Sequence, residues 1–162
     1  MLIKRNIFAT LILVFAVSSA FSQDNKKTGS KTDNPSVRSS SAYAEVILRK
    51  TELEADLESV SADYTEANPK LLDIRFELSS LDKDLDKIFA VPPSETQKLT
   101  LVLGKLMVRK AALETELNRL GRSYNKDHPD VKRQKKRVEI FDAAIKEILR
   151  GDSCKLRKEK GQ

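Results

Sequence analysis

The only histidine of the chain has the clearest capacity for chemistry, because an imidazole can act as a general base or a metal ligand near neutral pH. His128 lies in the segment SYNKDHPDV, residues 123–131, directly before Pro129. A catalytic histidine needs a nucleophile, a carboxylate or a metal ion held against it. An equivalent segment earlier in the chain has Asn68 in the same place, before Pro69. We therefore interpret His128 as a turn residue, with a pH-sensitive helix cap as the alternative.

Three alternating aspartates, Asp82, Asp84 and Asp86, are the nearest approach to a metal-binding motif. They imitate the opening of a calcium-binding loop, which needs a glycine at its sixth position and a glutamate at its twelfth. Lys87 and Pro93 stand at those positions, so we interpret the aspartates as part of a solvated helix face. No metal ion, other cofactor or enzymatic activity is therefore predicted.

A cluster of cations is the strongest candidate for partner binding. It could contact phosphate or acidic polysaccharide, but no aromatic residues alternate with it to stack on bases, so nucleic acid is not predicted as a partner. The favoured interpretation is an exposed helix face that meets an acidic partner helix. The cluster comprises Lys132, Arg133, Lys135, Lys136 and Arg137.

These residues are positioned by four segments in which apolar side chains recur at alternating spacings of three and four. That period is typical of helices packed as a coiled coil. Lys50 and Lys110 each occupy an apolar position near the open end of a predicted hairpin, where the ammonium group is expected to reach water. Gln134 fills a third such position. The apolar positions are Val46, Leu53, Leu57, Val60 and Tyr64; Leu71, Ile74, Leu78, Leu81, Leu85 and Ile88; Leu99, Leu103, Leu106, Leu113, Leu117, Leu120 and Tyr124; and Val131, Val138, Phe141, Ile145 and Ile148.

The chain also repeats itself, since residues 45–71 match residues 105–131, 60 positions later. Each copy contains a proline, Pro69 or Pro129, which cannot lie inside a straight helix but suits the first turn of a new one after an N-cap residue. The fold is therefore predicted to be all-α, with two duplicated antiparallel helical hairpins that pack like a coiled coil or as a four-helix bundle. A kinked but continuous long helix is the alternative.

The N-terminal segment has the order of a secretory signal, with basic, then apolar, then small side chains. Lys4 and Arg5 precede the apolar residues 7–17, which are too few to cross a bilayer, since about 20 are needed. Cleavage is favoured over a retained anchor, so the protein is predicted to be exported, periplasmic or secreted, without a membrane span. The predicted segments are a signal peptide at 1–22, a disordered linker at 23–40, hairpins at 41–89 and 96–150, a proline-rich connector at 90–95 and a polar tail at 151–162.

The only cysteine, Cys154, lies in the polar tail. In an exported protein a single thiol is a candidate for an intermolecular disulfide. An unpaired thiol is the favoured interpretation.

The two hairpins carry opposite charge. Residues 43–89 contain 12 acidic and 6 basic residues, a net charge of −6, whereas residues 103–149 contain 7 acidic and 12 basic residues, a net charge of +5. Opposite fields favour packing of one hairpin on the other. This packing is expected either within a chain or between chains, so self-association is a candidate interaction.

The motif Tyr124-x-x-x-His128-Pro129-Asp130-Val131, followed by heptads, resembles the periplasmic coiled-coil region of exopolysaccharide co-polymerases, also called chain-length determinant proteins. The resemblance implies a role in polysaccharide export or chain-length control. The leading hypothesis is a non-enzymatic scaffold or adaptor of the bacterial cell envelope that binds proteins through its coiled-coil faces. A small periplasmic holdase-type chaperone is the alternative.

Overall fold

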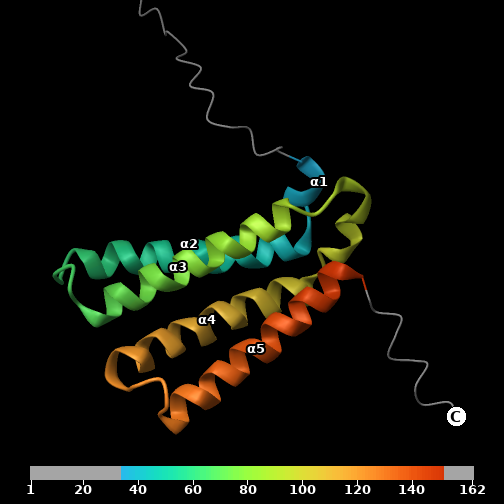
Figure 1. The fold of residues 1–162 in the computed structure, drawn as a ribbon. Coiled ribbons are helices and arrows are strands. Elements are labelled where there is room, and N and C mark those ends of the chain that lie inside the picture. Colours follow the sequence, from blue (N-terminus) through green and yellow to red (C-terminus); the bar gives the residue numbers. More distant parts are fainter. Residues whose placement is uncertain (1–33, 152–162) are drawn as a thin grey trace, which may run out of the picture. The chain divides into compact units, whose positions relative to one another are not determined.

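The computed structural model describes residues 34–151, which form helices joined by short connections (Figure 1). This part of the chain contains no strand, and the predicted all-α fold is confirmed. The elements are α1 (Pro35–Arg38), α2 (Ser41–Ser61), α3 (Pro69–Phe89), the 3-10 helix η1 (Pro93–Lys98), α4 (Leu101–Ser123) and α5 (Pro129–Arg150).

Each long helix pair turns back at a proline. Asn68 caps α3, because its side-chain oxygen accepts a hydrogen bond from the backbone N–H of Lys70 at 2.8 Å. His128 caps α5 in the same way, since its Nδ1 accepts from the N–H of Asp130 at 3.2 Å. A proline follows each cap at the first helical position, where its missing N–H costs no hydrogen bond. α2 packs on α3 and α4 packs on α5, so each copy of the repeat is a hairpin and not one long helix.

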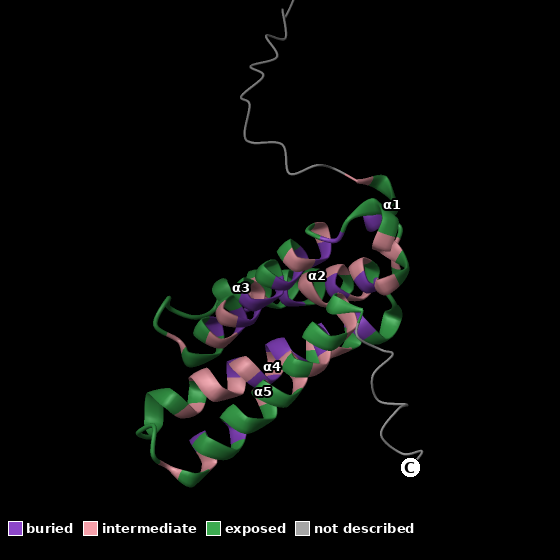
Figure 2. Cartoon of the chain, turned by 45° about the vertical axis from the view of Figure 1, so that its right-hand side comes forward, coloured by how far each residue is buried: buried purple, intermediate pink, exposed green. Residues whose placement is uncertain are grey.

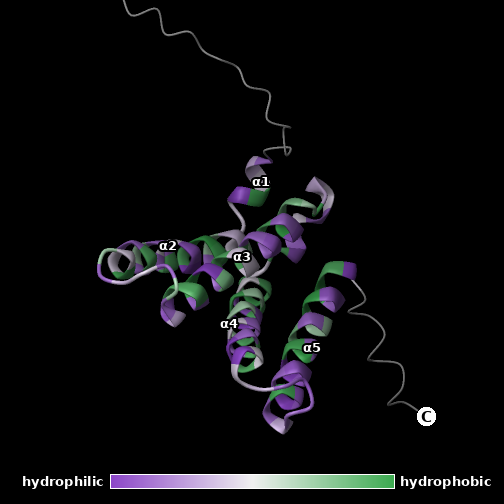
Figure 3. Ribbon diagram, turned by 60° about the vertical axis from the view of Figure 1, so that its left-hand side comes forward, coloured by the Kyte–Doolittle hydropathy of each residue, from purple (hydrophilic) through white to green (hydrophobic). Residues whose placement is uncertain are grey.

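The two hairpins pack through α4, which contacts α2, α3 and α5. Within the described chain, α5 has at most marginal contact with α2 and α3, and Figure 3 shows it beside α4 and away from the first hairpin. A closed four-helix bundle would give every helix two neighbours. The four-helix bundle expected as one arrangement is therefore not formed, and α5 is covered on one side only.

The core follows this packing. Buried positions gather where α2, α3 and α4 face one another, whereas α5 is mainly exposed (Figure 2). Gly104 of α4 lies at the crossing with α2, where a Cβ atom would stand 2.9 Å from the Cα of Ala42. The two backbones therefore approach closely because residue 104 has no side chain. The largest fully buried apolar side chains are Leu71, Leu81, Ile88, Leu103, Met107, Ile145, Val37 and Val46.

Two predicted boundaries need correction. The disordered linker at 23–40 is wrong for residues 34–40, because Asn34 caps α1 and Val37 is completely buried. The proline-rich connector at 90–95 is too short, because η1 extends it and α4 begins at Leu101 and not at residue 96. The predicted signal peptide, the rest of the linker and Cys154 with its tail lie outside the described residues.

Candidate functional site

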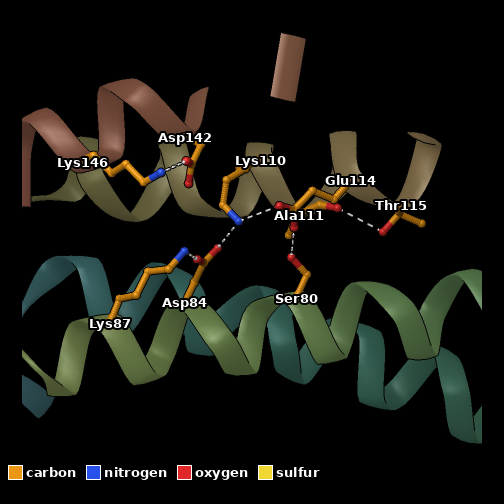
Figure 4. A network of polar contacts seen from close by, with 9 residues as sticks. All are labelled: Ser80, Asp84, Lys87, Lys110, Ala111, Glu114, Thr115, Asp142 and Lys146. Carbon is orange, nitrogen blue, oxygen red and sulfur yellow. Dashed lines mark hydrogen bonds and ion pairs between the residues drawn. The ribbon is translucent and has the colours of Figure 1, made fainter. Parts of the chain in front are cut away.

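A cluster of charged side chains lies at the junction of the two hairpins, where α3 meets α4 (Figure 4). Asp84 of α3 is completely buried and Lys110 of α4 is 3% exposed. The Nζ atom of Lys110 lies 3.4 Å from Oδ2 of Asp84 and 3.0 Å from Oε1 of Glu114. This ion pair joins one hairpin to the other, because Asp84 and Lys110 belong to different copies of the repeat.

Other groups complete the cluster on the α3 side. Lys87 contacts Oδ1 of Asp84 at 2.6 Å, and the hydroxyl of Ser80 donates a hydrogen bond to Glu114. Oδ2 of Asp84 accepts no hydrogen bond from the described residues. The charge of the Asp84 carboxylate is balanced by two ammonium groups, that of Lys87 at Oδ1 and that of Lys110 near Oδ2.

The electrostatics of the cluster keep Lys110 charged. Burial by itself would lower the pKa of Lys110, but the charges of Asp84 and Glu114 outweigh it and hold that pKa above its ordinary value. A lysine acts as a nucleophile through its neutral amine, which needs a lowered pKa. The ammonium group of Lys110 is therefore suited to hold two carboxylates together and not to attack a substrate.

A groove with a volume of about 470 Å³ opens beside the cluster, between α3, α4 and α5. Its lining mixes apolar and charged side chains. Among the charged ones, the pKa of Asp142 is lowered by the hydrogen bond from Lys146, so Asp142 stays ionised and does not supply a general acid. The lining residues are Phe76, Ser80, Lys83, Lys87, Lys110, Glu114, Leu117, Asn118, Val138 and Asp142.

The cluster overturns two sequence-based predictions. Asp84 does not belong to a solvated helix face, and the ammonium group of Lys110 does not reach water at an open hairpin end. Both residues are covered because the second hairpin packs its first helix on the α3 face that carries Asp84. Lys50, the counterpart of Lys110, behaves as expected: it is partly exposed and contacts Asp82 at 2.5 Å.

The turn residues Asn68, Pro69, His128 and Pro129 lie where the helices reverse. His128 also stacks on Tyr124, with 4.2 Å between the ring centroids. Nδ1 of His128 accepts the hydrogen bond from the backbone N–H of Asp130, so this nitrogen serves to cap the helix. Tyr124 itself is exposed, as is Tyr64, because both side chains lie at the turns and outside the apolar seams that had been predicted to include them.

The basic cluster lies on the uncovered side of α5, and all five of its side chains are exposed. Its ion pairs are local, since Lys132 contacts Asp127 at 3.0 Å, Arg133 contacts Asp130 at 2.5 Å and Lys136 contacts Glu139 at 3.5 Å. Arg137 donates a hydrogen bond to Gln134. Within residues 34–151, no acidic helix covers this face.

Among the described residues, no group of three or more histidine, cysteine, aspartate or glutamate side chains could hold a metal ion. None of the described helices is both long and apolar enough to span a bilayer. Comparison with models of protein families, with curated proteins and with solved structures gave no match. The resemblance to exopolysaccharide co-polymerases therefore stays a prediction from the sequence motif.

Proposed function

We propose that the protein is a non-enzymatic scaffold or adaptor of the bacterial cell envelope, exported by its signal segment, that binds other proteins through the faces of its helical hairpins. One observation carries the proposal. Among the long helices, α5 packs mainly on α4 and leaves five exposed cations on its other side. An ordered helix with an open charged face suits recognition of a partner, because complementary charge steers association and selects the partner.

The interior of the molecule supports the same role. The buried pair of Lys110 and Asp84 fixes one hairpin against the other, and a buried ion pair of this kind can select one packing arrangement over others. The faces that remain open are thereby held at fixed positions relative to one another. A scaffold needs this property, because its partners must be bound in a defined geometry.

Polysaccharide export or chain-length control is the process that we propose the scaffold serves. The motif from Tyr124 to Val131 supports this choice, since it resembles the coiled-coil region of proteins that act there. Acidic polysaccharide is a further ligand that the cations of α5 could contact.

The experiment that tests the proposal is photo-crosslinking in bacterial cells. A photoreactive residue replaces Lys135, which is exposed on α5 and has no ion-pair partner among the described residues. We expect the chain to fractionate with the envelope and to form discrete adducts of reproducible mass. The same residue at Lys70, which is exposed on α3, is the matched control and should form none of them.

Two results would contradict the proposal. Retention of the chain in the cytoplasm would remove the envelope role. A broad range of adducts with unfolded proteins, together with suppression of their aggregation, would identify a holdase-type chaperone instead. Co-purification of the adducts with glycan-export components would support polysaccharide export as the process that the scaffold serves.

A further inference from the structure

The two hairpins share one interface within the chain, with one side on the first hairpin and the other side on the second. Because the hairpins are copies of one repeat, each also contains counterparts of the residues on the side that it does not supply. The first hairpin supplies α3 with Ser80 and Asp84, and the second supplies α4 with Ala111 and Glu114. Because the copies are offset by 60 residues, α5 corresponds to α3 and α2 corresponds to α4. The second hairpin therefore presents an α3-like side, and the first hairpin presents an α4-like side, with no second interface between them.

On α5, the side that corresponds to the covered side of α3 is open. Ile140 is 57% exposed, whereas its counterpart Ser80 is 3% exposed. The cations around Ile140 make the surface strongly basic. Lys105 and Arg109 of α4, which are the exposed counterparts of Glu45 and Arg49, extend this surface. We call this surface the basic open face. It consists of Lys105, Arg109, Arg133, Lys136, Arg137 and Ile140.

On α2, the side that corresponds to the covered side of α4 is also open. Thr51 and Ala55 are exposed, whereas their counterparts Ala111 and Thr115 are buried. Leu48 is 59% exposed in the same surface. We call this surface the acidic open face. It consists of Ala44, Leu48, Thr51, Glu54, Ala55 and Glu58.

We propose that a second copy of this chain docks its acidic open face on the basic open face of the first, which repeats between chains the packing that joins the two hairpins within one. The two faces are opposite in charge, and each includes a large exposed apolar residue, Leu48 or Ile140. Such an interface joins different surfaces of the two copies. It leaves one face of each kind free at the ends, so assembly continues head to tail. This inference rests on the proposed scaffold function, because it identifies a second copy of the chain as a partner that the scaffold binds.

The interface between chains is weaker than the one within the chain. Ala44 stands where α4 has Gly104, and its Cβ atom prevents the close approach that the α2–α4 crossing shows. Ala144 stands where α3 has Asp84, so no buried ion pair forms. The contact then depends on exposed charges and two apolar side chains, which makes the assembly reversible and sensitive to salt.

Sedimentation velocity of the full chain tests the proposal by a charge swap. The average mass should rise with protein concentration at low salt and return toward that of one chain at about 1 M salt, where the Debye length is about 3 Å. Arg133→Glu/Lys136→Glu/Arg137→Glu makes both open faces acidic, because only Lys105 and Arg109 then oppose three glutamates on the former basic face, and Glu54→Lys/Glu58→Lys makes both basic. Each variant alone should stay monomeric, and an equal mixture of the two should associate again. Circular dichroism should show that both variants remain helical.

Cysteine crosslinking identifies the orientation of the copies. Glu54→Cys and Ile140→Cys are made separately in a Cys154→Ser background, because their counterparts Glu114 and Ser80 are hydrogen-bonded within the chain. Neither protein alone should form a disulfide dimer, whereas the mixture should form one. Dimers of either protein alone would indicate a two-fold symmetric contact and would overturn the head-to-tail arrangement. A wild-type chain that stays monomeric at low salt, or a mixture that does not associate, would overturn the proposal altogether.

Failure of this inference and failure of the proposed function are distinguishable. A purified chain that does not self-associate, but that still forms envelope adducts from Lys135 in cells, removes the second copy as partner and leaves the scaffold role intact. A chain that self-associates in solution but is retained in the cytoplasm removes the envelope role and leaves the interface intact.

Discussion

Lys110 of α4 lies 3.4 Å from Asp84 of α3, and both side chains are buried at the junction of two hairpins that descend from the same repeat. The counterparts of these residues do not form such a pair, because Ala144 replaces the aspartate in the second copy. Lys50 contacts Asp82 within its own hairpin. The duplicated sequence thus makes two different sets of charge contacts, one inside the first hairpin and one between the hairpins.

For the buried pair of Asp84 and Lys110, we expect the losses of stability caused by two single substitutions to be non-additive. Asp84→Leu or Lys110→Met should each lower the free energy of unfolding by about 3 kcal/mol, because each leaves a buried charge with one opposite charge fewer beside it. This loss lies at the lower end of the range for breaking buried ion pairs, since Glu114 remains beside Lys110 and Lys87 remains beside Asp84. The double variant should cost less than the sum of the two single variants, because no unpaired charge is then left. Urea unfolding followed by circular dichroism measures all three.

The pair of Lys50 and Asp82 is the matched control for burial. Asp82 is more than half exposed, so Asp82→Leu should change the free energy of unfolding by no more than about 1 kcal/mol. Equal losses from Asp82→Leu and Asp84→Leu would show that burial at the hairpin junction has no energetic consequence.

The stability of the protein should fall at alkaline pH in a way that depends on Lys110. The pKa of Lys110 is raised in the folded state above the unfolded value of about 10.4. Its contribution is therefore fully present below about pH 10.4 and is lost as the pH rises through the folded pKa. The difference in unfolding free energy between wild type and Lys110→Met should shrink above that pH. A difference that stays constant from pH 8 to about 12 would contradict this assignment.

The sequence was sufficient to predict the helices and the turns, because these depend on local signals. The seam of apolar residues from Leu71 to Ile88 and the proline at the start of α3 specify a helix and its first residue without reference to the rest of the chain. The antiparallel hairpin follows from the short connection between two such helices. α1 was missed because its four residues have no period, and its position is secured by the burial of Val37.

The candidate site was not predictable in the same way. Asp84 and Lys110 lie on helix faces that the heptad pattern assigns to solvent or to the open end of a hairpin. Their burial results from how one hairpin is placed on the other, and a period of three and four residues contains no such information. One signal was present in retrospect. Gly104 interrupts a helix of good helix formers, and a glycine there indicates close approach of another backbone.

This crossing predicts opposite effects for two glycines of α4. Gly104→Ala should destabilise the protein by about 1–3 kcal/mol, because the added Cβ atom would stand 2.8 Å from the Cβ of Glu45 and 2.9 Å from Ala42, which is tighter than packed helices tolerate. Gly121→Ala is the matched control. No atom lies within 4 Å of its added Cβ, and alanine favours helix over glycine, so stability should rise by about 0.5–1 kcal/mol. Two stabilised variants would show that α2 and α4 do not cross closely.

The last prediction separates the cap at His128 from any catalytic role. Asn68→Ala removes only the side-chain acceptor for the N–H of Lys70 and should cost about 1 kcal/mol. His128→Asn keeps a cap for α5 but loses the stacking on Tyr124, whereas His128→Ala loses both. The difference between the two His128 variants should therefore equal the cost of Asn68→Ala, as measured by urea unfolding. Because a cap requires only an acceptor, His128→Asn should also support normal envelope function in cells. Loss of that function by a His128→Asn chain that folds as stably as predicted would show that the imidazole itself takes part in the activity.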